Sequence, residues 1–190
     1  MQIKDIATIR TGVYLRPEEY KDIVYLQVKD FNERGDYIGV ANPNIFDKKI
    51  PEHHLLKDGD ILFAAKGSKN FATVYRGSDL TAVASSVFFV LSLTEDIIPE
   101  YVAWFINQTS SQKQLKSEAM GTSMLSISIG SISELEIIIP DYRTQKIIVE
   151  LDRLRSKERY LYQELISKRQ KLLDIKIFTR IKNQELNNAN

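Results

Sequence analysis

The chain has 190 residues, of which 43% are hydrophobic and 27% charged, a composition typical of a folded globular protein rather than a disordered one. It contains no cysteine, which excludes a disulfide framework and a cysteine-ligated metal site. No apolar run approaches the roughly 20 residues of a membrane span, and the first residues lack a signal-peptide core, so we expect a cytoplasmic protein.

The net charge of +1 conceals an uneven distribution of charge along the chain. Residues 1–140 contain 14 Lys and Arg against 18 Asp and Glu, a net charge of −4. Residues 141–180 contain 11 Lys and Arg against 6 Asp and Glu, a net charge of +5. The basic segment could attract a polyanion, although a solvated helical face is the commoner cause of such an excess.

Strand signals dominate the first 95 residues. Residues 23–28 (IVYLQV), 60–65 (DILFAA) and the longer run 82–93 (AVASSVFFVLSL) are rich in β-branched and aromatic residues. Glycine-containing turns separate these segments. Because strands and helices do not alternate regularly, we expect an α+β fold with a β-rich domain and a few helices, not a doubly wound parallel sheet.

One helix is predicted over residues 98–121. Pro99 suits its first turn, and Gly121 ends it. Residues 122–139 return to strand and turn character, and the isoleucines at 137–139 predict a buried strand.

A long helix is predicted after Pro140, with Asp141 as its N-cap. Residues 142–180 contain no Pro or Gly, and at 1.5 Å per residue these roughly 39 residues would extend about 58 Å, longer than one small domain is wide. We therefore divide the chain into a globular domain (1–140), a long helix (141–180) and a polar tail (181–190) that we expect to be disordered.

The long helix carries a coiled-coil seam at alternating spacings of three and four residues. The nine seam positions are Ile147, Leu151, Leu154, Glu158, Leu161, Leu165, Lys168, Leu172 and Ile175. The chain offers no second long helix to cover this seam, so we expect a homodimer. Glu158 and Lys168 lie ten residues apart, and an antiparallel pair would place one chain's Glu158 near the other chain's Lys168.

Signatures of catalysis are poor. There is no phosphate-binding GxxxxGK[ST] loop, no GxGxxG and no GxSxG. His53 and His54 are adjacent, so they cannot share one helical face, and we expect them at a loop–strand junction. Gln27 and Lys29 match half of a nuclease metal site, but Asp5 and Asp22 are only formal candidates for its acidic partner. We predict no catalytic residue, no cofactor and no metal ion.

One loop has the composition of a nucleic-acid contact. Residues 66–70 combine two lysines, a glycine, a serine and an asparagine directly after a predicted strand. Such a loop can bring backbone amides and cations to a phosphate, and asparagine can pair with adenine. An ordinary hairpin with solvated lysines fits the spacing equally well. With the nearby Arg76 and a second small-residue turn, the candidate DNA contacts are Lys66, Gly67, Ser68, Lys69, Asn70, Arg76, Thr122 and Ser123.

Taken in order, these segments resemble the specificity (S) subunit of a bacterial type I restriction–modification system, in half-length form. The resemblance is carried by IKDIATIRTG at the start, YLQVKDF, GDILFAAKGS, IPEYVAWFIN, the Gly121–Thr122 turn and LEIIIPDYRTQKIIVELDRL at residues 135–154. No single segment is specific, but the ordered set covers nearly the whole chain.

The resemblance implies a non-catalytic subunit that reads DNA. Residues 1–140 would be a target recognition domain for a short half-site in double-stranded DNA, and the long helix would be a spacer. Full-length members carry two such domains and two antiparallel helices, so a homodimer of this chain would rebuild the arrangement and read a bipartite, palindromic target. Its partners would be the methyltransferase (M) and restriction (R) subunits, which it would direct to the site.

The sequence departs from the family pattern in two respects. The family's junction usually has a second proline and a glutamate before the glutamine, where this chain has Asp141, Tyr142 and Thr144. The acidic balance of residues 1–140 is unusual for a DNA reader, so we expect the isolated chain to bind DNA weakly. Two alternatives stay open at this point: a coiled-coil scaffold with a protein-binding head, and a silent recognition cassette without partners.

Overall fold

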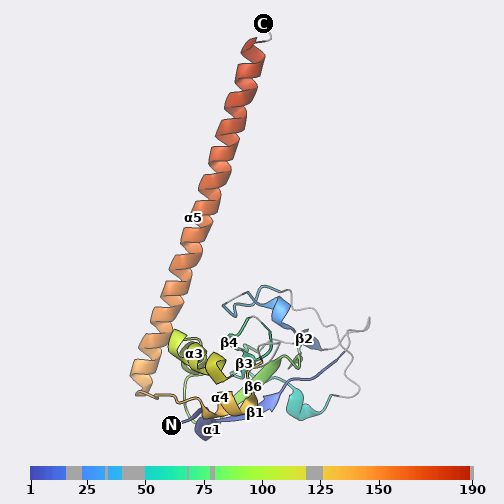
Figure 1. Cartoon of the computed structure of the whole chain (residues 1–190), viewed down its shortest axis with the longest axis vertical. Coiled ribbons are helices and arrows are strands. Elements are labelled where there is room, and N and C mark those ends of the chain that lie inside the picture. Colours follow the sequence, from blue (N-terminus) through green and yellow to red (C-terminus); the bar gives the residue numbers. More distant parts are fainter. Residues whose placement is uncertain are drawn as a thin grey trace. The chain divides into compact units, whose positions relative to one another are not determined.

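A computed structural model of the chain describes residues 1–15, 23–32, 34–39, 50–67, 69–77, 80–118 and 126–188. The chain divides into a globular unit (Met1–Lys146) and a helical unit (Ile147–Asn190) (Figure 1). In the described part of the chain, none of the helices combines the length and apolar character needed to cross a membrane.

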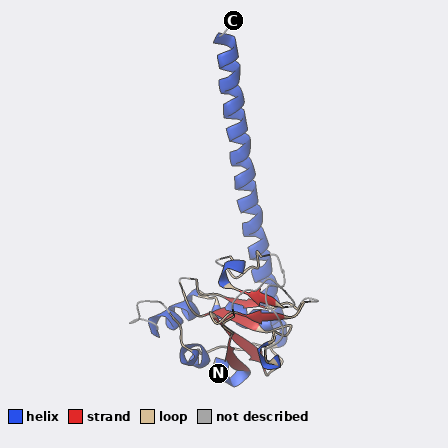
Figure 2. Ribbon diagram, turned by 90° about the vertical axis from the view of Figure 1, so that its right-hand side faces the viewer, coloured by secondary structure: helices blue, strands red, loops and turns tan. Residues whose placement is uncertain are grey.

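A four-stranded antiparallel sheet forms the centre of the globular unit (Figure 2). Its strand order is β1-β6-β3-β4, so strands distant in sequence lie side by side. The register is fixed by pairs such as Ile9 with Leu91 and Phe63 with Phe89. The four strands are β1 (Ala7–Thr11), β3 (Ile61–Ala64), β4 (Ala72–Val74) and β6 (Phe88–Leu93).

A second sheet contains two short parallel strands, β2 (Val24–Leu26) and β5 (Ala82–Ala84). Side chains from both sheets meet in one apolar cluster, which includes Leu26, Leu62 and Phe88. The opposite face of β3 is buried as well, since Ile61 and Phe63 have no exposed surface. This explains why residues 60–65 read as a continuous apolar run rather than an alternating one.

Short helices complete the globular unit, and the α+β fold class is confirmed. Helix α4 packs against α1, and α2 packs against β4. The helical elements are α1 (Ile3–Ile6), η1 (Val28–Asp30), η2 (Glu52–His54), α2 (Pro99–Ile106), α3 (Thr109–Glu118) and α4 (Ile129–Glu134).

The single helix predicted over residues 98–121 is wrong, because α2 and α3 are separate helices. The break lies at Asn107, whose side-chain amide is used elsewhere. Its Oδ1 accepts from the backbone N–H of Ala72 at 2.8 Å, and its Nδ2 donates to the Ala72 carbonyl at 2.7 Å. Asn107 thus pairs with edge strand β4 as a neighbouring strand would. The predicted end at Gly121 lies outside the described residues.

The long strand predicted over residues 82–93 is also wrong. A turn after Ser85 divides it into β5 and β6, which belong to different sheets. The turn packs closely against Gly12, where a Cβ would lie 2.1 Å from the Ser85 carbonyl oxygen. The strand predicted over residues 23–28 is shorter than expected, because η1 begins at Val28.

Residues 137–139 do not form the predicted buried strand. The segment has one isolated bridge, between Gln2 and Glu136, and one backbone hydrogen bond from Ile137 N to the Met1 carbonyl oxygen at 2.9 Å. Ile137 is buried, but Ile138 is 74% exposed. A short helix, α4, precedes this segment where strand and turn character was expected.

Helix α5 (Tyr142–Asn188) has 47 residues and no interruption (Figure 1). Its N-cap is Asp141, as predicted, because the Asp141 carboxylate accepts from both the backbone N–H and the hydroxyl of Thr144. The helix continues eight residues beyond the predicted end at 180. The tail expected over 181–190 is helical through Asn188, and no helix-breaking residue interrupts the segment.

Candidate nucleic-acid interface

The predicted DNA loop is anchored at its base and open at its tip. Ala64, the last residue of β3, donates its N–H to the Phe71 carbonyl at 2.8 Å, which closes the loop. Lys66 and Lys69 are exposed. Gly67 has a φ of +101°, and no atom lies within 4 Å of where its Cβ would be. The loop therefore needs glycine for its backbone conformation, and it leaves space around that backbone for a ligand to approach.

Asn70 helps to hold this loop rather than pointing freely outward. Its Nδ2 donates to the Ala64 carbonyl at 2.9 Å, and the side chain is half-buried. A bidentate contact with adenine would have to replace this hydrogen bond. The two lysines are the loop's available cations, while Ser68 lies outside the described residues.

A second segment lies beside the loop. Ser126 forms an isolated antiparallel bridge with Lys66, and Ile127 donates its N–H to the Ala65 carbonyl at 2.8 Å. The predicted contacts Thr122 and Ser123 lie outside the described residues, which resume at Ser126.

Arg76 is held by two carboxylates. It forms ion pairs with Asp58, at 3.4 Å, and with Glu100 in the first turn of α2. Asp58 also accepts from the backbone N–H of Gly77 at 2.8 Å. The Arg76 charge is thus compensated within the globular unit, so it is less available to a phosphate than the charges of Lys66 and Lys69.

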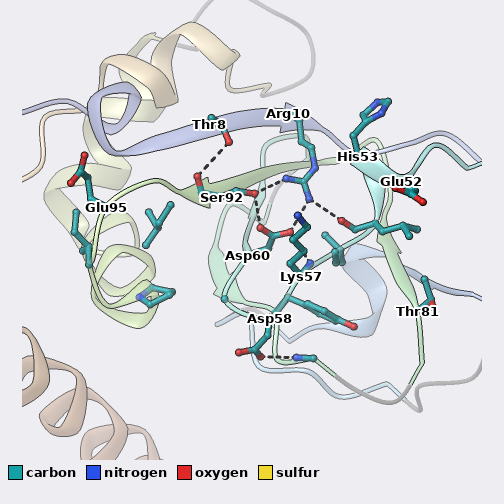
Figure 3. A pocket seen from close by; sticks show the side chains of 18 of the residues that line it. Thr8, Arg10, Glu52, His53, Lys57, Asp58, Asp60, Thr81, Ser92 and Glu95 are labelled. Carbon is teal, nitrogen blue, oxygen red and sulfur yellow. Dashed lines mark hydrogen bonds and ion pairs between the residues drawn. The ribbon is translucent and has the colours of Figure 1, made fainter.

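An open cleft of about 1300 Å³ occupies another part of the globular unit (Figure 3). An ion pair lies in its floor: Arg10 Nη2 and Asp60 Oδ2 are 2.7 Å apart, and Asp60 is 3% exposed. Ser92 joins both groups, accepting from Arg10 Nη1 and donating to Asp60 Oδ1, each at 2.6 Å. The backbone N–H of Lys57 donates to the same carboxylate at 3.0 Å. Through these bonds Asp60 holds together three segments of the globular unit.

The charges lining this cleft do not favour a polyanion. Lys57 and Arg10 face four acidic residues, Glu52, Asp58, Asp60 and Glu95. This balance distinguishes the cleft from the loop at Lys66 and Lys69.

His53 lines the cleft, and both histidines lie in η2, which is followed by an isolated bridge between Leu55 and Val83 instead of the expected strand. Their ring centroids are 4.2 Å apart. Burial lowers the pKa of His54, and the charges of His53 and Arg10 lower it further. These causes favour the neutral imidazole of His54.

The residues resembling a nuclease half-site have structural neighbours instead. Asp30 Oδ2 accepts from the backbone N–H of Gln27 at 2.8 Å, which caps η1. Asp5 caps α1 in the same way by accepting from Gln2 N at 2.7 Å. Asp22 lies outside the described residues. Among the residues that the structure describes, no three His, Asp or Glu side chains are grouped so as to hold a metal ion.

The predicted seam forms a second candidate surface on α5. Its seven apolar residues, from Ile147 to Ile175, are each between 48% and 63% exposed. Lys168 forms an ion pair with Glu164 one turn earlier at 2.6 Å, and this contact raises the pKa of Lys168. Glu158 and Lys168 interrupt this apolar stripe, and among the described residues of its unit no second element covers it.

Comparison with known families decides what kind of chain this is. Residues 1–166 match the model of the type I restriction modification DNA specificity domain. The chain belongs to this family. The prediction made from the ordered segments is thereby confirmed, and so is the assignment to a recognition family rather than an enzyme family.

Solved structures of specificity subunits share the fold of this specificity domain. The S subunit of a type I restriction–modification system from M. genitalium is 18% identical, with a TM-score of 0.55 over 83% of this chain and 38% of that one. The HsdS subunit of Thermoanaerobacter tengcongensis is 14% identical, with a TM-score of 0.56 over 83% of this chain and 37% of that one.

A chain from a study of assembly and conformational transition in the type I R-M system is 17% identical, with a TM-score of 0.66 over 86% of this chain and 43% of that one. This specificity domain thus spans about two fifths of the length of the solved chains it matches. A search of curated proteins gives no match.

Sequence reasoning missed the ion-paired residues in the floor of the cleft. Arg10, Asp60 and Ser92 come from three strands or turns and meet only in the folded sheet. The one signal in the sequence is that Arg10 and Asp60 are charges within or beside apolar strand segments, where a buried partner is needed.

Proposed function

We propose that this chain is half of a DNA-recognition subunit, acts as a homodimer, and directs a methyltransferase and a restriction subunit to a bipartite DNA site. The observation that carries the proposal is the half-exposed apolar seam of α5 on a chain of the specificity family. Each globular unit would read one half-site, and the paired helices would set the distance between the half-sites.

DNA contact is assigned to the loop at residues 66–70. Lys66 and Lys69 are exposed, and the loop base is fixed by the hydrogen bonds of Ala64. Cations on an anchored loop position a protein on the phosphate backbone, whereas base edges are read by neighbouring side chains. Thr122 and Ser123 remain proposed contacts from the adjacent segment.

The homodimer is proposed to be antiparallel. If Glu158 of one chain lies opposite Lys168 of the other, then Leu161 lies opposite Leu165, and Leu154 lies opposite Leu172. Every seam position from 151 to 175 then faces another seam position. A parallel pair would instead place Glu158 against Glu158 and Lys168 against Lys168, where like charges repel.

Engineered thiols test this orientation, because the native chain has no cysteine. In the antiparallel pair residue 151 faces residue 175, while the two copies of residue 151 are about 36 Å apart along the helix. Mixed Leu151→Cys and Ile175→Cys chains should form a disulfide-linked dimer, and Leu151→Cys alone should not. A disulfide from Leu151→Cys alone would indicate a parallel pair, and a monomer at micromolar concentration would contradict the homodimer.

Methylation mapping tests the function itself. Cells with the gene should methylate a bipartite palindromic motif that cells without it leave unmodified. A Leu161→Asp chain, which places a charge in the seam, should remove the same methylation. No difference between cells with and without the gene would show that the chain is not an active specificity subunit.

A further inference from the structure

One side of α5 carries a line of exposed cations. We call Arg155, Arg159, Arg169, Lys176 and Arg180 the basic face, and all five side chains are exposed. At about 100° per residue, they fall within about 100° of arc around the helix, with Arg159 at one edge and Lys176 at the other. The five cations therefore follow the length of the helix on one side instead of surrounding it.

The ion pairs of α5 lie outside the basic face. Among the described residues of the helix, Arg153 binds Glu150 at 2.7 Å, and Lys168 binds Glu164 at 2.6 Å. None of the five cations of the basic face forms such a pair in this part of the chain. Their charge is therefore free to attract an anionic ligand.

The flank on the other side of the seam is nearly balanced in charge. It carries four cations and three acids, namely Lys146, Arg153, Lys157 and Lys171 with Glu150, Glu164 and Asp174. The acids nearest the basic face, Asp152 and Glu158, lie at its two edges, about 60° around the helix from Arg155. The two flanks of the seam thus differ strongly in charge.

An antiparallel pair of helices places the basic faces of both chains on the same side. The two-fold axis of such a pair enters through one flank and leaves through the other, so like flanks of the two chains adjoin. With Glu158 opposite the partner's Lys168, Arg155 lies nearest to the partner's Arg169. Cations therefore adjoin cations on this side of the pair, and an anion bound there would relieve their repulsion.

Duplex DNA is the anion whose symmetry fits this surface. A two-fold dimer on a palindromic site shares its axis with the site, and the axis crosses the DNA in the middle of the spacer between the half-sites. The spacer must therefore face one of the two flanks of the helix pair. The basic flank attracts its line of phosphates, whereas the balanced flank does not.

We propose that the basic face of α5 binds the phosphates of the DNA between the two half-sites. This inference rests on the proposed function and adds to it a contact that does not depend on base sequence. Phosphate contacts position a protein on the duplex without reading it. The helix pair would thus hold the spacer DNA as well as set the distance between the half-sites.

Removing two cations from either flank tests the contact. Arg155→Gln/Arg169→Gln should lower the affinity for a labelled duplex longer than the helix pair at least about tenfold at low salt, because each dimer loses four cations that contact phosphate. Lys157→Gln/Lys171→Gln is the matched control, since it removes the same charge from the other flank. It should change the affinity less than about twofold. Equal losses in the two variants would overturn the proposal.

Crosslinking shows which flank faces the DNA. Tyr160 and Tyr162 are 62% and 59% exposed, and they lie about 160° apart around the helix, Tyr162 within the basic face. With a photoreactive label on the engineered thiol, Tyr162→Cys should crosslink to the duplex and Tyr160→Cys should not. A duplex that stays unbound, or that crosslinks equally from both positions, would overturn the proposal.

Failure of this inference can be told apart from failure of the proposed function. If the chain dimerises and supports methylation of a bipartite motif, but Tyr162→Cys gives no crosslink to DNA, the spacer contact alone is overturned. A monomeric wild type would overturn the homodimer and the spacer contact together. If polyglutamate displaced the duplex as readily as unlabelled duplex does, the basic face would fit an acidic protein, and the assignment to DNA would be overturned.

Discussion

Asp60 shows how much one residue can determine in this fold. It is nearly fully buried, and its carboxylate binds Arg10, Ser92 and the Lys57 backbone. These partners come from β1, β6 and the turn before β3, so one side chain connects elements distant in sequence. A buried charge with a complete set of partners is stable, but it becomes costly once a partner is removed.

Asp60→Ala should therefore lower the free energy of unfolding by about 3–5 kcal/mol, because Arg10 would lose its buried counter-ion. Chemical denaturation with urea measures the change. Asp58→Ala is the control, since the Asp58–Arg76 pair is exposed, and it should cost about 1 kcal/mol or less. The double variant Arg10→Met/Asp60→Ala should lose less unfolding free energy than the two single variants lose together. Full additivity would show that the two residues do not act as a pair.

Asp141 predicts a dependence on pH. Hydrogen bonds from the Thr144 hydroxyl and backbone N–H lower the pKa of Asp141 below its usual range. The ionised carboxylate therefore stabilises the folded helix above the unfolded pKa of about 3.9, and this contribution disappears as pH falls through the lower folded value.

The difference in melting temperature between wild type and Asp141→Ala should be largest near neutral pH and should shrink below about pH 4. Thr144→Val removes one of the two donors, so it should give a smaller difference with the same trend. A difference between wild type and Asp141→Ala that stays constant down to pH 2 would contradict this role of the charge.

Among the elements, the start of α5 shows how a helix is joined to a globular unit. Gln145 is 3% exposed although it lies in the first turn of a largely exposed helix. Its Oε1 accepts from Ile98 N, just before α2, at 3.0 Å, and its Nε2 donates to the Pro140 carbonyl at 2.9 Å. One amide thus satisfies backbone groups from two segments.

Gln145→Leu should destabilise the globular unit by about 1–3 kcal/mol, because the half-buried Ile98 N–H and Pro140 carbonyl lose this partner. Gln145→Glu keeps the acceptor for Ile98 N and should cost less. Urea denaturation followed by Trp104 fluorescence measures both effects. If Leu and Glu at this position were equally tolerated, the hydrogen bonds would not matter for stability.

The elements that sequence patterns predicted well are those whose causes are local. Asp141 as N-cap, the uninterrupted α5 and the strand after Gly59 follow from residue spacing and helix breakers. The failures have distant causes. Helix α2 ends at Asn107, whose side chain binds Ala72. The run 137–139 has the residues of a strand, but the one isolated bridge beside it joins Glu136 to Gln2.

The candidate interface shows the same division between local and distant causes. The composition of residues 66–70 drew attention to the loop, and its exposed lysines agree with that expectation. Local sequence could not indicate that Arg76 binds Glu100, which is 24 positions away, or that Asn70 closes the loop on Ala64. Side-chain availability depends on tertiary partners, which spacing alone does not provide.

For the whole molecule, the distribution of charge bears on DNA binding. Residues 1–140 carry a net charge of −4 and residues 141–180 one of +5, so within the globular unit any attraction to phosphate must come from local cations. The loop offers Lys66 and Lys69, while Arg76 and Arg10 are paired with acids. We therefore expect the globular unit to bind DNA weakly and with a small dependence on salt.

Lys66→Ala/Lys69→Ala should reduce the slope of log affinity against log salt concentration by a little under 2, because each phosphate contact contributes about 0.9 on duplex DNA. Titration of a labelled duplex at several salt concentrations measures the slope. Lys57→Ala, which removes a cation from the acidic cleft, is the control and should leave the slope unchanged. If Lys57→Ala reduced the slope and the double lysine variant did not, the DNA would bind in the cleft and not at the loop.

The pairing of Asn107 with Ala72 also affects how the protein behaves at high concentration. An open sheet edge can recruit the edge of another molecule, and repeated recruitment produces fibrils. At Ala72 the amide of Asn107 occupies both backbone groups through which such growth would begin on β4. We therefore expect Asn107→Ala to free these two backbone groups and to increase aggregation at high concentration.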